Sequence, residues 1–222
     1  MAQVGDNVRS GPTNGGQDPL PRRKTGDSGA TSPAEGYSMA RAIKIAFVTA
    51  VAALALAGQA QARGGNYVFA GGSAPQRAQV RSALEASSFN WSLVREQIKI
   101  HIAPVGHSYS TRGEIWLDTR LLNAGRFSWA VVQDEYSHQV DFFLFDAATR
   151  TKLNALLGGK DWCYGVSGFM HREYGCERFA STLVWSYWPS RDNAYKPDSK
   201  SAESAAMAPA RFRALMRQMV RA

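Results

Sequence analysis

Residues 128–143 have the sequence SWAVVQDEYSHQVDFF, which predicts a single buried helix. Ser128 is a typical N-cap residue, so we expect the helix to begin there. The large apolar residues that follow recur at steps of three and four, which forms one stripe facing a protein core. The stripe consists of Trp129, Val132, Tyr136, Val140 and Phe143.

Three ionisable side chains interrupt the apolar residues of this helix. Asp134 and His138 are four residues apart, which places them one turn apart on the same face, and Glu135 lies about 100° round the helix from Asp134. This is the spacing of H-E-x-x-H, a motif in which two residues one turn apart bind zinc and the glutamate acts on a water molecule. Here the first histidine is an aspartate. A structural hydrogen bond between Glu135 and His138 would explain the same pattern without a metal.

The first 62 residues differ in composition from the rest of the chain. Residues 1–38 are rich in Gly, Pro, Ser, Thr and Asn, so we expect a disordered extension, or a stretch upstream of a true start at Met39. Residues 39–62 contain two positive charges, an apolar run over 45–57 and a small-x-small pattern, which are the three parts of a secretory signal peptide. The sequence therefore predicts a secreted or extracytoplasmic protein in which residues 63–222 form one domain.

The apolar run is shorter than the roughly 20 residues of a membrane span, so we expect no stable span after signal cleavage. An uncleaved anchor is the alternative interpretation. Of the 26 Lys and Arg, 6 lie in residues 1–62, as do 4 of the 18 Asp and Glu, so residues 63–222 carry a net charge of about +6. The arginines are scattered without interleaved aromatic residues, so we expect no nucleic-acid partner.

Both cysteines, Cys163 and Cys176, lie in the exported part. Two thiols in one small domain of an oxidising compartment usually pair, so we predict a disulfide bond between them. A loop of this length would stabilise the fold by about 3 kcal/mol in the chain-entropy model. Zinc ligation by a cysteine is the alternative, but the two lack the C-x-x-C spacing of many zinc sites.

The residues that precede the central helix contain the patterns of three strands. Strict alternation of three isoleucines predicts a half-buried strand over residues 97–102. Shorter strands are expected over residues 66–70 and 113–118.

Helical patterns account for most of the remainder. Ser73 and Gln76 form a capping box that predicts a helix ending near residue 86, with Val80, Ala83 and Leu84 facing inward. We expect further helices over residues 147–157, 174–188 and 207–220. The intervening residues 189–206 are expected to form a loop.

This order of elements resembles the zincin metallopeptidases, and specifically the gluzincin branch, in which a glutamate on a later helix is the third zinc ligand. The resemblance rests on Glu135, His138 and the sequence Glu177-Arg178-Phe179-Ala180-Ser181, in a frame covering about residues 64–222. The chain is similar to a small exported peptidase-type family with H-E-Y-x-H-Q-V-D-F followed by G-C-E-R-F-A. The resemblance implies an α+β fold, with a small mixed sheet packed against the motif helix and the glutamate-bearing helix.

The resemblance also implies roles for four residues. His138 and Glu177 would bind zinc, Glu135 would be the general base, and Asp134 would take the place of the missing histidine ligand. A carboxylate oxygen binds zinc at about 2.0–2.2 Å, so Asp134 is chemically suitable. Because two carboxylates favour harder ions, manganese or calcium is conceivable as well.

Other assignments stay open at this stage. Asp134 could lie outside the ligand set, with His101, His107 or His171 supplying a nitrogen instead. His171 and Asp141 are also candidates to orient the ligands through hydrogen bonds, Asp141 by contacting the second nitrogen of His138. Loss of a ligand residue is also how an inactive relative of an enzyme arises.

Two functions from different classes follow. The first is a monomeric, exported, metal-dependent hydrolase whose peptide or protein substrate would lie along the strand over residues 113–118. The second is a non-catalytic secreted binding protein that has kept the fold and lost the chemistry. The sequence contains no P-loop, dinucleotide-binding fingerprint or serine nucleophile elbow, which argues against those classes of enzyme.

Overall fold

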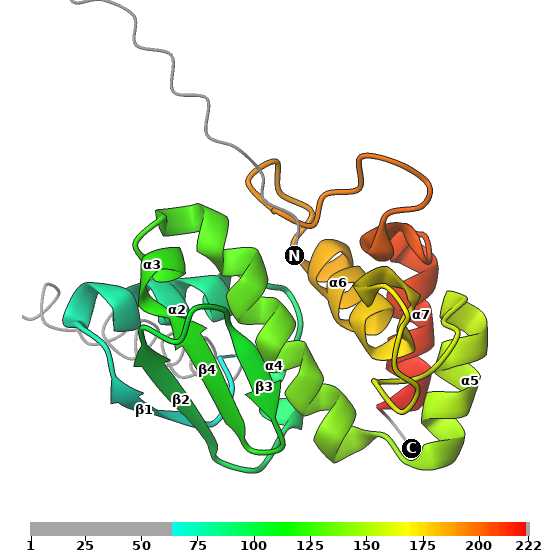
Figure 1. The fold of residues 1–222 in the computed structure, drawn as a ribbon, viewed down its shortest axis with the longest axis horizontal. Coiled ribbons are helices and arrows are strands. Elements are labelled where there is room, and N and C mark those ends of the chain that lie inside the picture. The colour runs from blue at the N-terminus through cyan, green and yellow to red at the C-terminus, as the bar shows by residue number, and fades with distance from the viewer. Residues whose placement is uncertain (1–63, 221–222) are drawn as a thin grey trace, which may run out of the picture. The chain divides into compact units, whose positions relative to one another are not determined.

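The computed structural model describes residues 64–220 of the chain (Figure 1). The expectations for residues 1–38 and 39–62 therefore fall outside the described residues. Within the described part, one four-stranded sheet and six α-helices form an α+β fold, which confirms the predicted fold class at this level. None of the described helices has the length and apolar character needed to cross a membrane.

The sheet is mixed and has the strand order β1-β2-β4-β3. β1 (Tyr67–Gly71), β2 (Ile98–Ala103) and β4 (Glu114–Asp118) run parallel and match the three predicted strands. β3 (Tyr109–Thr111) is antiparallel to β4, and its three residues are too few for an alternating pattern to predict. The strand over residues 113–118, along which a substrate was expected to lie, is not an edge strand, because the chain turns at Gly113 (φ +84°) and β3 pairs with β4 on that side.

One face of the sheet carries the core. Ile98, Ile100 and Ile102 are buried on β2, as their alternation predicts. They pack in one apolar cluster with Leu84 and other residues of α2 (Ala74–Ala86). The predicted capping box begins α2, since the Gln76 backbone N–H donates to the Ser73 hydroxyl and the Ser73 N–H donates to the Gln76 side chain.

The central helix is α4 (Ser128–Leu144), and it lies between the sheet and α6 (Figure 1). Its apolar stripe enters the core as predicted, with Val132, Tyr136 and Val140 fully buried. The expected N-cap is wrong. A 3₁₀ turn, η2 (Gly125–Phe127), runs directly into the helix, so the Ser128 hydroxyl lies inside the first turn and donates to the Gly125 carbonyl at 2.7 Å.

Three further helices pack on the other side of α4 and match the predicted ranges. They are α5 (Ala147–Leu157), α6 (Gly175–Tyr187) and α7 (Pro209–Met219). α6 packs against the other three helices, α4, α5 and α7. α5 ends at Gly158, whose left-handed φ of 73° a residue with a side chain rarely adopts.

The remaining elements are short. They are α3 (Thr119–Leu122) and the 3₁₀ turns η1 (Trp91–Leu93), η3 (His171–Glu173) and η4 (Glu203–Ala205). The predicted disulfide between Cys163 and Cys176 is present and joins the segment before η3 to the first turn of α6. This first turn is closely packed, because a Cβ on Gly175 would come within 2.8 Å of the Trp162 ring.

Candidate functional site

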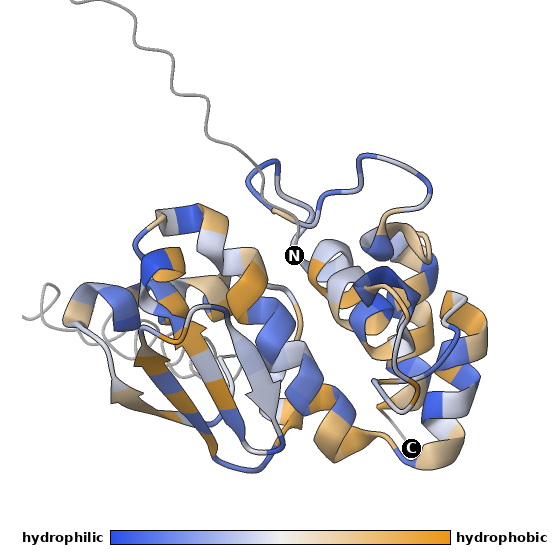
Figure 2. Cartoon of the chain, in the orientation of Figure 1, coloured by the Kyte–Doolittle hydropathy of each residue, from blue (hydrophilic) through white to orange (hydrophobic). Residues whose placement is uncertain are grey.

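The middle of α4 is polar and yet buried. Figure 2 shows hydrophilic residues there, between hydrophobic ends of the helix. Two of them are structural. The Gln139 amide donates to the carbonyls of Thr111 and Glu114 and accepts from the Gly113 N–H at 2.8 Å, so it holds the turn between β3 and β4. The Gln133 amide donates to the Ala83 carbonyl and ties α4 to α2.

Three other polar residues of α4 face a cavity of about 610 Å³. Asp134, Glu135 and His138 line one wall, and Glu177 in the first turn of α6 lines the same cavity. All four side chains are buried. β3 with the segment leading into it, the disulfide-bonded loop and the loop after α6 add His107, Ser108, Tyr109, Ser110, Cys163, Tyr164, His171 and Tyr195 to the lining. Three apolar residues, Leu121, Val131 and Phe142, complete it.

The structure brings together the three residues expected to bind a metal. His138 Nε2 lies 3.4 Å from Glu177 Oε2 and 3.9 Å from Asp134 Oδ2. Two ligand atoms bound to one tetrahedral zinc at about 2.1 Å are about 3.4 Å apart. The distances from His138 are therefore near those of a metal centre.

The Asp134 carboxylate supports this interpretation. No hydrogen bond to it is found among residues 64–220, although the residue is only 6% exposed. Burial raises the pKa of Asp134 well above its usual range, against the lowering effect of His138. A buried carboxylate without a donor is suited to a cation. Among the described residues, however, the group whose ligand atoms all lie within 4.8 Å of one another is His138, Cys176 and Glu177, so Asp134 has to move closer to Glu177 to hold a metal together with His138 and Glu177.

Cys176 stands next to this group. Possible ligand atoms of His138, Cys176 and Glu177 lie within 4.8 Å of one another, close enough for three residues to hold one metal ion. The Cys176 sulfur is bonded to Cys163, however, so it offers no thiolate while the disulfide is intact. Asp134, whose Oδ2 lies 3.9 Å from His138 Nε2, is therefore the remaining candidate for a third ligand in the oxidised protein, and it reaches a common metal only by a shift toward Glu177.

Glu135 is held by the edge strand. The Ser110 hydroxyl on β3 lies 2.9 Å from Glu135 Oε2 and 2.8 Å from the Glu135 carbonyl oxygen, and it can donate to either. Burial raises the pKa of Glu135, and the neighbouring His138 and Ser110 oppose that rise. The carboxylate is thus oriented by β3 and made more basic by its surroundings.

His171 extends the site by an ion pair with Glu177 and a hydrogen bond with Glu203. Its Nε2 lies 3.1 Å from Glu177 Oε2, and its Nδ1 lies 2.8 Å from Glu203 Oε1. The two carboxylates raise the pKa of His171 to about 10. Burial lowers the pKa of His138, but Glu177 and the other acids outweigh it and raise the value to about 9. Burial raises the pKa of Glu177 in turn, and the two histidines overcome this effect and hold the value low.

The other residues expected at the site lie elsewhere or play other parts. Asp141 does not contact His138 as expected, because its carboxylate accepts from Arg150 at 2.7 Å and Trp162 at 3.1 Å. His101 lies on the opposite face of the sheet from the core, where its ring stacks on Trp116 at 4.5 Å. His107, the third alternative ligand, lines the cavity.

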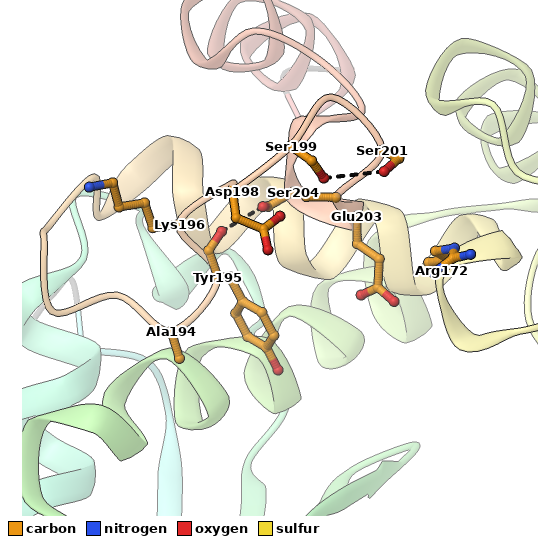
Figure 3. Close-up of a pocket in the computed structure, with 10 residues that line it drawn as sticks. Arg172, Ala194, Tyr195, Lys196, Asp198, Ser199, Ser201, Glu203 and Ser204 are labelled. Carbon is orange, nitrogen blue, oxygen red and sulfur yellow. Dashed lines mark hydrogen bonds between the residues drawn. The ribbon is translucent and has the colours of Figure 1, made fainter.

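Three residues at the site were not found from the sequence: Ser110, Tyr195 and Glu203. Figure 3 shows Tyr195 extending from the loop after α6 toward α4, with Glu203 between it and Arg172. A second cavity of about 400 Å³ is lined by this loop and by Arg172; Glu203 lines it, and Tyr195 lines both cavities. A lone aromatic residue in a polar loop is a weak signal of a buried anchor, and Glu203 gives no signal at all.

Comparison of the chain with protein-family models, with curated proteins and with solved structures found no match in any of the three. The geometry of the cavity and the residues of the motif are therefore what point to a function.

Proposed function

We propose that this protein is an exported, metal-dependent, peptidase-like hydrolase on a zincin-like fold. The observation that carries the proposal is the convergence of four buried side chains, Asp134, Glu135, His138 and Glu177, on one cavity. Three of them form the ligand set, with zinc as the expected metal and another divalent ion as the alternative. Export is supported by the disulfide and by the signal-peptide pattern of residues 39–62.

Each residue then has a defined task. A divalent cation in such a site supplies Lewis-acid polarisation of the scissile carbonyl and makes a water molecule more acidic. Glu135 takes the proton from the attacking water and passes it to the leaving amine. Its raised pKa suits this exchange near neutral pH, and Ser110 holds its carboxylate in position. His171 and Glu203 orient Glu177 from outside the ligand set.

The edge strand suggests how a substrate binds. β3 is one of the two edge strands of the described sheet, and the segment containing it lines the cavity through Ser108, Tyr109 and Ser110. An extended peptide can add to such an edge by main-chain hydrogen bonds. Because Ser110 also contacts Glu135, a peptide on β3 would pass beside the general base.

A non-catalytic binding protein is the second candidate, and one observation favours it. His138 and His171 both lie within 3.4 Å of Glu177, and His171 also contacts Glu203 at 2.8 Å, so two imidazolium and two carboxylate groups balance one another without any metal. In that case Asp134 marks the loss of an ancestral metal site. The cavity would then hold a ligand without cleaving it.

Metal content of the purified protein separates the two candidates. We expect about one zinc per chain by elemental analysis, lost in a His138→Ala/Glu177→Ala double variant and removed by a chelator. The matched variant is Asp134→His, which restores the H-E-x-x-H motif and should bind zinc more tightly. Hydrolysis of unstructured protein substrates should follow metal content across these proteins.

The opposite results are equally informative. If the wild type stays metal-free after reconstitution while Asp134→His binds zinc, the binding-protein candidate replaces the hydrolase. Zinc that persists in the double variant would mean that the metal lies elsewhere on the chain.

A further inference from the structure

The disulfide bond lies directly beside the candidate metal centre. Cys176 is fully buried in the first turn of α6, directly before the candidate ligand Glu177. Its sulfur lies 3.6 Å from Glu177 Oε1, and it falls within 4.8 Å of the ligand atoms of both Glu177 and His138. An oxidised sulfur has no hydrogen to donate, so this proximity is a packing contact in the disulfide form.

We infer that reduction of the Cys163–Cys176 disulfide changes the ligand set of the centre, because the freed Cys176 thiolate joins His138 and Glu177 as a zinc ligand. The oxidised protein offers two carboxylates and one imidazole, a set that tolerates hard ions. The reduced protein offers a thiolate in addition, which selects softer metals such as zinc. The proposal rests on His138 and Glu177 being ligands in the proposed function, and it does not depend on peptide hydrolysis.

The chemical step is ordinary thiol–disulfide exchange with a dithiol reductant. A thiolate of the reductant attacks the Cys163 sulfur, the S–S bond breaks, and the electron pair leaves on Cys176. The second thiol of the reductant then attacks the mixed disulfide and releases Cys163. The protein gains two electrons and two protons, the reductant becomes a disulfide, and zinc binding displaces the proton of Cys176 to the solvent.

A reductant that enters the cavity meets the sulfur of Cys163. Cys163 lines the cavity and is partly exposed, whereas Cys176 is buried. Attack from the cavity therefore falls on Cys163, which makes Cys176 the leaving group beside the metal ligands.

The position of Cys176 does not depend on the disulfide alone. The backbone N–H of Gly175 donates to the Asp161 carbonyl and that of Cys176 donates to the Trp162 carbonyl, each at 2.7 Å. The close packing of Gly175 against Trp162 holds the same turn. We therefore expect the freed sulfur to stay beside Glu177 after reduction.

The test is cobalt titration of the full chain, because a thiolate bound to Co²⁺ gives a charge-transfer absorption that oxygen and nitrogen ligands do not give. Four samples are compared: oxidised wild type, wild type treated with a dithiol, Cys163→Ser and Cys176→Ser. The two variants both lack the disulfide and differ only in which thiol remains. We expect the absorption in the reduced wild type and in Cys163→Ser, and its absence from the other two.

Zinc affinity gives a second readout, measured by competition with a chromophoric chelator. Cys163→Ser should bind zinc more tightly than Cys176→Ser by at least the ~10–100-fold that changes around a metal site commonly produce. Adding His138→Ala to Cys163→Ser should remove this gain. Circular dichroism melts of both variants establish that each is folded before the comparison is made.

Three results would overturn the inference. They are no charge-transfer absorption in folded Cys163→Ser, equal absorption in Cys176→Ser, or absorption in the oxidised wild type. The proposed function can fail separately. A protein that shows the predicted absorption but hydrolyses nothing would support the change of ligand set and contradict the hydrolase function. An active oxidised protein whose Cys163→Ser variant shows no absorption would support the hydrolase function and contradict the change of ligand set.

Discussion

Buried polar side chains on the two sides of α4 differ in how many hydrogen bonds they make. On the side of β3 and β4, the Gln139 amide makes three hydrogen bonds to backbone groups, two of them shorter than 3 Å. On the cavity side, Asp134 finds no hydrogen-bond donor among the described residues, and Glu135 finds one. A buried carboxylate with no hydrogen-bond donor costs stability, so its presence indicates a function that the first side does not have.

The largest expected effect concerns the cavity side. If Glu135 is the general base, Glu135→Gln removes the proton acceptor and should lower the rate of peptide hydrolysis by about 10²–10⁴-fold. Metal content should stay at the wild-type level, because Glu135 is outside the ligand set. Turnover of an unstructured protein and elemental analysis of the same sample make the measurement.

Glu85→Gln is the matched control, since Glu85 is exposed on α2 and far from the motif in sequence. It should keep full activity. Equal loss in both variants, or full activity in Glu135→Gln, would remove Glu135 from the mechanism.

The next effect compares stability on the two sides. The side of α4 that packs on α2 and the sheet is the core side. Leu84→Ala on this side should lower the free energy of unfolding by about 2–5 kcal/mol, because it leaves a cavity among fully buried residues. Asp134→Asn in metal-free protein should leave the free energy of unfolding unchanged or raise it, because a neutral group of the same shape replaces a buried charge. Urea denaturation of both variants gives the values.

A large loss of stability in Asp134→Asn would break the comparison between the two sides. It would mean that the ion pair with His138, 3.9 Å away, stabilises the folded protein by more than the burial of the carboxylate costs.

The histidines make the metal-free protein sensitive to alkaline pH. The pKa values of His138 and His171 rise from 6.5 to about 9 and about 10. A group whose pKa is raised by folding stabilises the fold fully below its unfolded pKa, and this contribution is lost as the pH rises through the folded pKa. The melting temperature should therefore fall between about pH 6.5 and pH 10. In His171→Gln the fall should be smaller, and an unchanged slope would show that His171 does not titrate in this range.

The core side could be predicted from the sequence because its information is local. Alternation gave β2, a capping box gave the start of α2, and the stripe of α4 identified Val132, Tyr136 and Val140 as buried. Each of these patterns lies within a single element. β3 was missed because three residues do not form a pattern, and that omission put the expected substrate edge on the wrong strand.

On the cavity side, the sequence allowed predictions only for residues that belong to the motif or to the family resemblance. They placed His138 and Glu177 together, 39 positions apart in the sequence, and the structure finds them 3.4 Å apart. The contacts of Glu135 with Ser110 and of His171 with Glu203 join segments with no shared pattern. Asp141 was misassigned because helical spacing gives the direction of a side chain but not the Arg150 and Trp162 that meet it.

The smallest expected effect tests whether the two sides are energetically separate. Ser73→Ala removes the hydroxyl that accepts from the Gln76 N–H at the start of α2, and it should lower the free energy of unfolding by about 0.5–2 kcal/mol. Because Ser73 lies outside the cavity lining, metal affinity and any hydrolytic rate should not change. Urea denaturation and metal titration on one preparation test both statements. A change in metal affinity would mean that α2 transmits its stability through α4 to the site, and the sharp division between the two sides of α4 would have to be given up.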